Sequence, residues 1–517
     1  MKKLMVAFLT VALLMSVAAC GSSQESGDKH SSGDQSQSGQ TSQQSGDGKG
    51  KPVLKVLGFN AGFDPNKDIM ASAIEEATGY KVEYFMLPAE NADEKLNIEL
   101  SSGNSYDILK LSTSQYFKLV GQGALLALDD LLQAHGPDIK KGIHDTSWKA
   151  VQYDGKTYAV PMRKEYVKDV MESIIVRQDI LDELKIPLPT TLDEFYTALK
   201  TIKAKKPGMI PFTGPMADSG TGGTAWRLSP TISSAFGIYT EWQDIGGELV
   251  PMIKNSNMKA QLEFMNKLYK ENLIDADWPI NTSAIVIEKF TSGKAVMAMT
   301  DRNAAAQQII PMLVKNIPTA TAGHILPLIG HNGEQGAKVE DKILYYTAIP
   351  KSSKHAEDAV KYLNAKMVPE KFTYLTLGVE GKHFKRENNE YIPIMPIFNE
   401  ERFWSYWYLN SIDEENYPSM WLARVRKSPE MWDIFEKVSL KCADIGKADP
   451  LGYMPPNADV AKYAQSLNKM CNDYYLKVIA GAESADTLKS FQAQWDAAGG
   501  KAMTEEVNKW YKEFYKK

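Results

Sequence analysis

Short apolar strands alternate with amphipathic helices along most of this chain, and this pattern constrains the fold more than any other feature. Residues 53–59 and 82–87 are apolar and rich in β-branched or aromatic side chains, and residues 69–78 between them have a helical pattern. Strands that alternate with helices predict parallel or mixed sheets covered on both faces. The sequence therefore predicts an α/β fold, and its 517 residues are enough for two lobes or more.

The first twenty residues have the features of a secretory signal. Lys2 and Lys3 precede an apolar stretch that is short for a membrane span, and small residues lead into Cys20. This resembles the lipobox of bacterial lipoproteins, in which the Cys thiol receives diacylglycerol and the chain is cut before it. An ordinary signal peptide that contains a Cys is the alternative. We expect removal of residues 1–19 and lipidation of Cys20. The acyl chains would anchor the protein firmly, since each buried methylene contributes about 0.8 kcal/mol.

Residues 20–51 are predicted to be the lipidated Cys and a tether. From Gly21 to Gly50 the chain is mostly Ser, Gln, Gly and Asp, without an aromatic or aliphatic residue. Such a segment cannot bury enough apolar surface to offset its ordering entropy. As a flexible coil of about thirty residues it spans roughly 30 Å. This length suits a protein held on the extracellular face of a Gram-positive-like cell membrane.

Composition and motifs argue against several classes of function. The formal net charge is −5, and no clustered basic or RNP-like pattern supports nucleic-acid binding. No His-Glu-x-x-His, Gly-x-Ser-x-Gly or EF-hand pattern occurs, and the seven histidines lack ligand spacing. Acidic pairs such as Asp129-Asp130 are read as solvated surface. We therefore expect a protein that is not an enzyme and that uses no metal or cofactor.

Two cysteines remain when Cys20 is lipidated. Cys442 and Cys471 both lie in segments with a helical pattern, so a disulfide would need those helices to be adjacent. A disulfide and two buried free thiols are both compatible with the sequence. There is no Cys-x-x-Cys spacing, so a zinc site is not supported.

Several segments, in order, resemble the family 1 extracellular solute-binding proteins. Residues 153–161, Tyr-Asp-Gly-Lys-Thr-Tyr-Ala-Val-Pro, look like the hairpin before that family's first hinge crossing. Residues 290–297, Phe-Thr-Ser-Gly-Lys-Ala-Val-Met, look like its turn into a later strand. Residues 175–195 and 349–363 resemble two further strand and helix units. The resemblance runs from about Pro52 to the C-terminus.

Further segments resemble one branch of that family. Residues 378–383 and the ending with Trp495, Gly499-Gly500 and Trp510-Tyr511 look like the large lipoproteins that accompany oligosaccharide importers of Gram-positive bacteria. Many members of this branch carry a calcium-loop-like insertion where this chain has only residues 204–211. That stretch contains two lysines and no carboxylate, so calcium is not predicted there.

The resemblance implies a type II periplasmic-binding-protein-like fold with two hinge-connected lobes. The first lobe is expected to comprise residues 52–162 and about 327–377. The second is expected to comprise residues 163–326 and about 378–517. The ligand would lie in the cleft between the lobes, at strand ends, and closure would be a hinge motion.

Candidate ligand-binding residues follow from the same resemblance. Asn60 follows the first expected strand, where its amide could contact ligand or form a turn before Gly62. Tyr106 and Asp107 precede the strand at 108–111, a place that often lines the cleft in relatives. Asp107 could equally cap or pin a loop.

Other candidates lie at the crossing and in the second lobe. Arg163 and Glu165 follow the first crossing and could contact ligand or form a hinge ion pair. Trp226 follows a glycine-rich stretch and is a candidate stacking platform for a sugar. Asp301 and Arg302 follow a strand at a cleft-lining position of the family and are the preferred polar pair.

Two tryptophans complete the set. Trp404 and Trp407 are three residues apart, which is also the spacing of helix residues in a core. Core packing is therefore expected for at least one of them. Four arginines give a weak hint of an acidic saccharide: Arg163, Arg227, Arg302 and Arg402.

These observations together predict a lipid-anchored binding protein of an ABC importer. It would bind a carbohydrate, an oligosaccharide by preference, and deliver it to permease subunits as a monomer. The alternatives are a ligand sensor for a membrane kinase, a binding protein for peptide or another polar solute, and a lipid-anchored polysaccharide-degrading enzyme. The last would need a nucleophile or acid/base pair, and none stands out.

Overall fold

A computed structural model describes residues 50–164, 166–215 and 230–515. The predictions for the signal peptide, Cys20 and the tether lie outside these residues, as do those for Glu165, Trp226 and Arg227. Among the described residues, no helix is long and apolar enough to cross a membrane.

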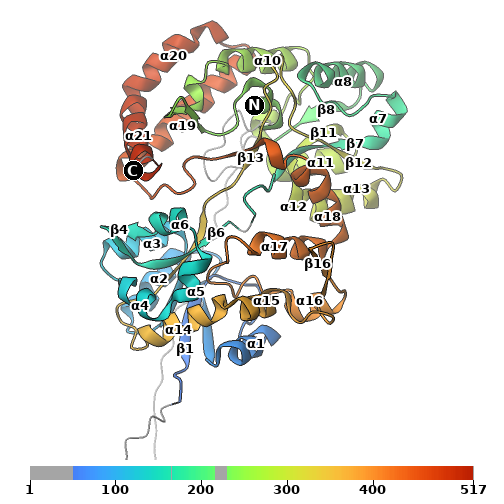
Figure 1. Cartoon of the computed structure of the whole chain (residues 1–517). Helices are drawn as coiled ribbons and strands as arrows, with labels where there is room; N and C mark the ends of the chain where they lie inside the picture. Colours follow the sequence, from blue (N-terminus) through green and yellow to red (C-terminus); the bar gives the residue numbers. More distant parts are fainter. Residues whose placement is uncertain (1–49, 165, 216–229, 516–517) are drawn as a thin grey trace, which may run out of the picture. The chain divides into compact units, whose positions relative to one another are not determined.

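The first sheet has five strands in the order β2-β1-β3-β14-β6. Figure 1 labels two of its strands, β1 and β6. Strand β1 is parallel to its neighbours β2 and β3, whereas β14 is antiparallel to both β3 and β6. Strands β1, β3 and β6 therefore end at one edge of the sheet, where β14 begins. The strands are β1 (Leu54–Gly58), β2 (Val82–Met86), β3 (Ile108–Leu111), β6 (Ala159–Arg163) and β14 (Ile343–Ala348).

The second sheet has four strands in the order β12-β7-β11-β8. Strand β11 is parallel to β8 and antiparallel to β7, and β12 is also antiparallel to β7. Strands β8, β11 and β12 thus end at one edge. The strands are β7 (Glu172–Arg177), β8 (Ile210–Thr213), β11 (Ala295–Asp301) and β12 (Ala322–Ile325).

Each sheet is covered on both faces, as the strand patterns predict. In β1, Leu54 and Val56 belong to one buried cluster and Leu57 to the cluster on the other face. In β7, Ile174 and Ile175 likewise separate into two clusters. Because successive strand residues point to opposite faces, each sheet is the middle layer of its own lobe. The predicted two-lobed α/β fold is confirmed.

Two helices around the first sheet, α1 and α3, begin with a side-chain cap. Asp68 accepts a hydrogen bond from the backbone of Met70 at the start of α1, and Ser112 forms a capping box with Gln115. The helices that pack with this sheet are α1 (Ile69–Thr78), α2 (Ala92–Ser101), α3 (Thr113–Gly121), α4 (Asp129–His135), α5 (Pro137–Gly142), α6 (Asp145–Ala150), α14 (Ala356–Met367), α15 (Pro369–Leu377), α16 (Ile397–Arg402) and α17 (Tyr417–Arg426).

The second sheet is covered by a different set. A capping box between Thr191 and Glu194 is present at the start of α8. The helices around this sheet are α7 (Gln178–Leu184), α8 (Leu192–Lys205), α9 (Pro230–Ser233), α10 (Met258–Lys270), α11 (Ser283–Thr291), α12 (Arg302–Ala304), α13 (Ile310–Asn316), α18 (Pro429–Phe435), α19 (Ala458–Ala480), α20 (Leu488–Trp495) and α21 (Lys501–Tyr515).

The described residues also form four short two-stranded ribbons. The predicted hairpin at Asp154-Gly155 joins β4 to β5, and both turn residues have positive φ, as this turn requires. Strand β13 follows β12 of the second sheet and precedes β14 of the first sheet along the chain, and it pairs with β17. The ribbons are β4 (Gln152–Tyr153) with β5 (Lys156–Thr157), β9 (Trp242–Ile245) with β10 (Glu248–Pro251), β13 (Ala337–Val339) with β17 (Gly446–Ala448), and β15 (Phe384–Glu387) with β16 (Glu390–Pro393).

One long segment packs differently from the expected division of the chain. Residues 378–517 are expected in the second lobe, but Phe384, Phe398, Tyr408 and Trp421 belong to the buried cluster of the first sheet. We therefore propose that residues 384–425 belong to the first lobe and that the chain returns to the second lobe through α18.

The two cysteines beyond Cys20 are both buried and free. Cys442 packs on one face of the second sheet, and Cys471 packs in the cluster on the other face. Burial raises the pKa of Cys442 to about 11 and that of Cys471 to about 12. Of the two alternatives that the sequence allowed, the structure has the pair of buried thiols.

Candidate ligand-binding site

Open α/β sheets bind ligands at the edge where their parallel strands end. In the first sheet, this edge carries Phe59 and Asn60 directly after β1. Asn60 is exposed, and its side-chain oxygen accepts a hydrogen bond of 2.9 Å from the backbone of Gly62. Asn60 therefore forms the turn before Gly62 that the sequence allowed. Its exposed side-chain NH₂ group stays open to a ligand.

An aromatic shelf lies beside Asn60, formed by Phe59, Phe63, Tyr345, Trp404 and Trp407. The rings of Phe63 and Trp404 stack with centroids 4.3 Å apart, and Phe63 meets Trp407 edge-on at 5.6 Å. Phe59 and Tyr345 continue the shelf at 5.0 Å. Trp404 is 36% exposed, so a large apolar face is open to solvent. Such faces suit the C–H surface of a sugar ring.

The two predicted tryptophans have different roles in this shelf. Trp407 is partly buried, packs on Tyr84 and Tyr408, and donates its indole hydrogen to the carbonyl of Phe59 at 3.3 Å. Trp404 presents its ring to solvent. The expectation of core packing for at least one of them matches Trp407, and Trp404 is the one available to a ligand.

Two buried lysines hold the segment that carries the shelf. The ammonium of Lys110 donates to the carbonyls of Trp407 at 3.0 Å and Leu409 at 2.8 Å. The ammonium of Lys366 donates to the carbonyl of Tyr408 at 2.5 Å and to the side-chain oxygen of Asn410 at 2.6 Å. A buried segment without regular structure needs such donors, because unpaired carbonyls cost free energy.

Burial makes both lysines unusual. It lowers the pKa of Lys110 to about 7 and, together with the neighbouring Lys110 charge, lowers the pKa of Lys366 well below its ordinary value. Both lysines can be recognised in the sequence, because each is a charged residue at an otherwise apolar position. Lys110 interrupts an otherwise apolar strand, and Lys366 follows Leu363 by three residues on the apolar face of a helix.

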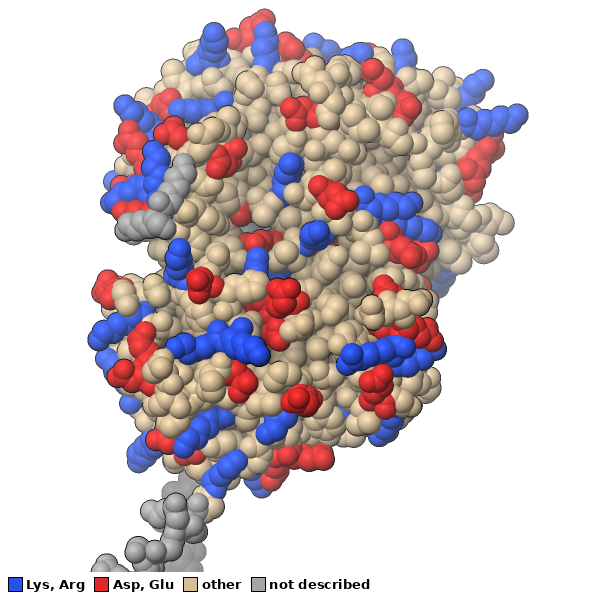
Figure 2. Space-filling model, in the orientation of Figure 1, with Lys and Arg blue, Asp and Glu red and all other residues tan. Residues whose placement is uncertain are grey.

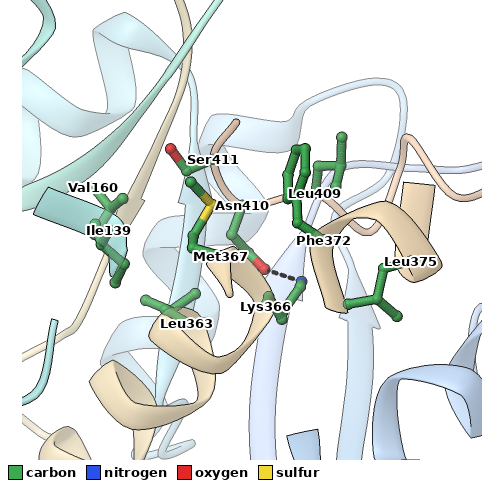
Figure 3. A pocket seen from close by; sticks show the side chains of 10 residues that line it. All are labelled: Ile139, Val160, Leu363, Lys366, Met367, Phe372, Leu375, Leu409, Asn410 and Ser411. Atoms are coloured by element: carbon green, nitrogen blue, oxygen red, sulfur yellow. Dashed lines mark hydrogen bonds between the residues drawn. The ribbon is translucent and has the colours of Figure 1, made fainter. Parts of the chain in front are cut away.

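A small cavity lies beside Lys366 under the same segment (Figure 3). Its volume of about 10 Å³ leaves room for a single water molecule. It is too small for a sugar and is not the ligand site. The lining residues are Ile139, Val160, Leu363, Lys366, Met367, Phe372, Leu375, Leu409, Asn410 and Ser411.

In the second lobe, the structure separates Asp301 from Arg302. Asp301 is partly exposed at the end of β11, and its carboxylate accepts from the backbone of Ala304 at 2.9 Å. Arg302 is 4% exposed and donates to Asp169 at 2.7 Å. Its guanidinium lies 4.9 Å from the ring centroid of Phe435. The expected polar pair is therefore corrected: Arg302 is part of the core, and Asp301 alone reaches the edge.

Arg163 forms the hinge ion pair that was the alternative to ligand contact. It donates to both carboxylate oxygens of Asp341, at 2.7 and 2.8 Å, and to Glu414 at 3.3 Å. The hydroxyl of Tyr453 also donates to Asp341. Burial raises the pKa of Glu414. Since Asp341 lies two residues before β14 and Arg163 is the last residue of β6, this network ties the chain segments that enter and leave the first sheet.

Tyr106 and Asp107 lie at the opposite edge of the first sheet, before β3 begins. Asp107 is 3% exposed and accepts from the backbone of Lys55 at 3.0 Å and from Ser353 at 2.8 Å. Tyr106 is 4% exposed and donates to Glu99 at 2.6 Å. Asp107 therefore pins a loop, and we assign neither residue to the site.

The structure thus brings together Asn60, Trp404 and Trp407 among the predicted residues. Asp301 lies at the corresponding edge of the other sheet. Sequence reasoning missed Phe59, Phe63 and Tyr345, because aromatic residues near strands are usually core residues. Within the described residues, no group of three or more His, Cys, Asp or Glu is placed to hold a metal ion.

A two-lobed α/β structure with an aromatic shelf at a strand-end edge defines a class of binding proteins. Residues 64–366 match the family of bacterial extracellular solute-binding proteins. This match covers more than half of the chain, and the chain belongs to that family. The family and the structural neighbours described below are binding proteins rather than enzymes.

Two curated relatives show the range of similarity. An uncharacterized protein of the butB 5′ region of Niallia circulans is 40% identical over 252 residues, which are 48% of this chain and 98% of that protein. The polygalacturonan/rhamnogalacturonan-binding protein YtcQ of Bacillus subtilis is 25% identical over 362 residues, 66% of this chain and 69% of YtcQ.

Solved structures share the fold at low identity. A solute-binding protein from Bifidobacterium longum infantis, described as binding HMO, has a TM-score of 0.64 at 16% identity, covering 90% of this chain and 99% of that chain. The alginate-binding protein AlgQ2 has a TM-score of 0.56 at 17% identity, covering 89% and 97%. These similarities establish the fold.

The buried pair of Arg302 and Asp169 gives the first prediction. Replacing Arg302 with Met leaves the Asp169 carboxylate without its buried cation, and we expect the free energy of unfolding to fall by about 3–5 kcal/mol. The control is Arg386→Met, which removes an exposed ion pair with Glu380 and should change stability by less than about 1 kcal/mol. Urea unfolding of both variants measures the difference, and equal losses would contradict the structural role of Arg302.

Lys110 gives a prediction about pH. Its pKa is about 7 in the folded protein and near 10.5 when unfolded, so the unfolded state binds more protons between these values. This lysine therefore makes the free energy of unfolding rise as pH increases from about 7. We expect a smaller rise between pH 7 and 9 in Lys110→Met than in the wild type. Urea unfolding at both pH values measures this, and Lys354→Met, an exposed lysine, should keep the wild-type slope.

Proposed function

We propose that this protein is the lipid-anchored substrate-binding component of an ABC importer for an oligosaccharide. The observation that carries the proposal is the aromatic shelf beside Asn60 at the strand-end edge of the first lobe. Rings of this kind offer flat faces to a sugar, and an amide offers hydrogen bonds to its hydroxyls. The shelf extends over more than one ring, which suits more than one sugar unit.

The relatives support a carbohydrate ligand and a transporter partner. YtcQ is named for binding polygalacturonan and rhamnogalacturonan, and a Streptococcus pneumoniae relative is named as a carbohydrate ABC transporter substrate-binding protein. A further Bacillus subtilis relative is named lipoprotein LipO, which supports lipidation of Cys20. We propose that this protein delivers its ligand to permease subunits at the extracellular face of the membrane, without changing it chemically.

Binding in this proposal depends on both lobes. The shelf belongs to the first lobe, and Asp301 lies at the strand-end edge of the second. A ligand that contacts both is bound most strongly when the lobes close, so it shifts the protein toward the closed form. The bonds of Arg163 and Tyr453 to Asp341 lie where such a motion must bend the chain. A permease could then distinguish the loaded protein by its shape.

The shelf provides the test of this function. An oligosaccharide that binds should raise the melting temperature of the wild-type chain, since a ligand at a hundredfold over its Kd adds about 2.7 kcal/mol. Trp404→Ala should weaken that binding about tenfold, because a stacking ring is lost. Tyr153→Ala removes an aromatic side chain of similar exposure, 37%, from a remote hairpin and should leave affinity unchanged. If peptides but no saccharide raise the melting temperature, the proposed ligand class is wrong.

A further inference from the structure

A group of cations surrounds the outer end of the shelf, at Phe403 and Trp404. Arg424 donates to the carbonyl of Phe403 at 2.9 Å and to the hydroxyl of Ser405 at 2.5 Å. Arg402 donates to the carbonyl of Glu401 at 2.8 Å. These hydrogen bonds go to uncharged oxygens and position both guanidinium groups near this end of the shelf.

Lys427 is the third cation at this end of the shelf. It directly follows α17, is partly buried, and its ammonium lies 3.6 Å from the ring centroid of Phe403. In the described parts of the chain, it has no carboxylate within ion-pair distance and no hydrogen-bond partner. The neighbouring Arg426, in contrast, is paired with Glu390 at 2.7 Å.

The rings next to this ammonium are open to solvent. Phe403 is 40% exposed and meets Trp404 edge-on, with ring centroids 4.7 Å apart. Trp404 in turn stacks on Phe63. Phe63, Trp404, Phe403 and Lys427 thus form a continuous row, with stacking surface along it and a positive charge at its end.

We propose that Lys427 binds the anionic group of an acidic saccharide whose ring packs on Phe403 and Trp404. The inference rests on the proposed function, and it names the class of sugar that the site prefers. An ammonium held beside a ring has lost part of its hydration, and an anion restores a strong partner. A neutral sugar would stack on the same rings but leave the ammonium without this compensation.

This assignment replaces three of the four arginines that the sequence suggested for an acidic ligand, and the fourth, Arg227, lies outside the described residues. Arg163 is bound to Asp341, Arg302 is buried against Asp169, and Arg402 is buried with its guanidinium over the ring of Tyr374. In each case the side chain is held within the fold. Lys427 differs because it is a cation beside exposed rings that lacks an internal acceptor among the described residues.

Protonation provides an independent signature of this role. Burial, with the Arg424 charge, lowers the pKa of Lys427 to about 7. Near pH 7 the free protein therefore holds a mixture of charged and neutral Lys427. An anionic ligand favours the charged form, so binding should take up about half a proton near that pH, and affinity should fall as pH rises. A residue that only supports the fold would not link ligand charge to proton uptake.

The test is calorimetric titration of the full chain with three probes: a galacturonic acid trimer, a sulfated saccharide and a neutral galactose trimer. The wild type should bind one or both acidic probes at least tenfold more tightly than the neutral trimer. Lys427→Met should lose about tenfold or more for the acidic probe and less than about twofold for the neutral one. Lys427→Arg should keep the affinity but show no proton uptake, because Arg stays charged.

Lys354→Met is the matched control, since it removes one exposed lysine charge from the loop that follows β14. Its affinities should equal those of the wild type. Equal binding of acidic and neutral probes, or an unchanged affinity in Lys427→Met, would overturn the inference and leave the proposed function standing. If no saccharide binds, the proposed function fails first and the inference fails with it.

Discussion

The clamp that Lys110 and Lys366 place on residues 407–410 is the interaction on which the site depends. This segment crosses a buried region without the hydrogen bonds of a helix or strand, so its carbonyls need donors from elsewhere. A lysine ammonium has three donors on a long stem and can reach several carbonyls at once. Burying two lysine side chains costs free energy, as their lowered pKa values show, and the fixed position of the shelf is gained in return. A loosely held Trp404 would lose conformational entropy on binding, and a fixed one loses less.

The shelf also shows why the site could only partly be predicted. The alternation of strands and helices, the hairpin at Asp154-Gly155 and the cap at Thr191 are local signals, and the structure confirms them. Trp404 could be predicted as a candidate, but its partner Phe63 is about 340 positions away in the chain, and their contact depends on tertiary structure. Which edge of a sheet a residue occupies follows from strand direction, and this placed Asp107 away from the site.

Arg302 failed as a candidate for a related reason. A charged residue directly after a strand can point to solvent or turn into the boundary between elements, and the sequence does not distinguish the two. Here Asp169 and the ring of Phe435 contact the buried guanidinium. Lys110 and Lys366 were detectable, since each is a charge at an apolar position, but their role depends on carbonyls about 300 and 40 residues away.

The charged residues near the lobe boundary therefore divide by their partners rather than by their type. Arg163 and Arg302 each have a carboxylate at hydrogen-bond distance, and such pairs hold chain segments together. A ligand that competed for them would have to break an existing ion pair, which offsets what it gains. Ligand binding costs less free energy at groups that have no ion pair to break, such as Asn60 and Trp404. Exposure together with the lack of an internal ion-pair partner is thus the physical criterion that separates a candidate binding residue from a structural one in this fold.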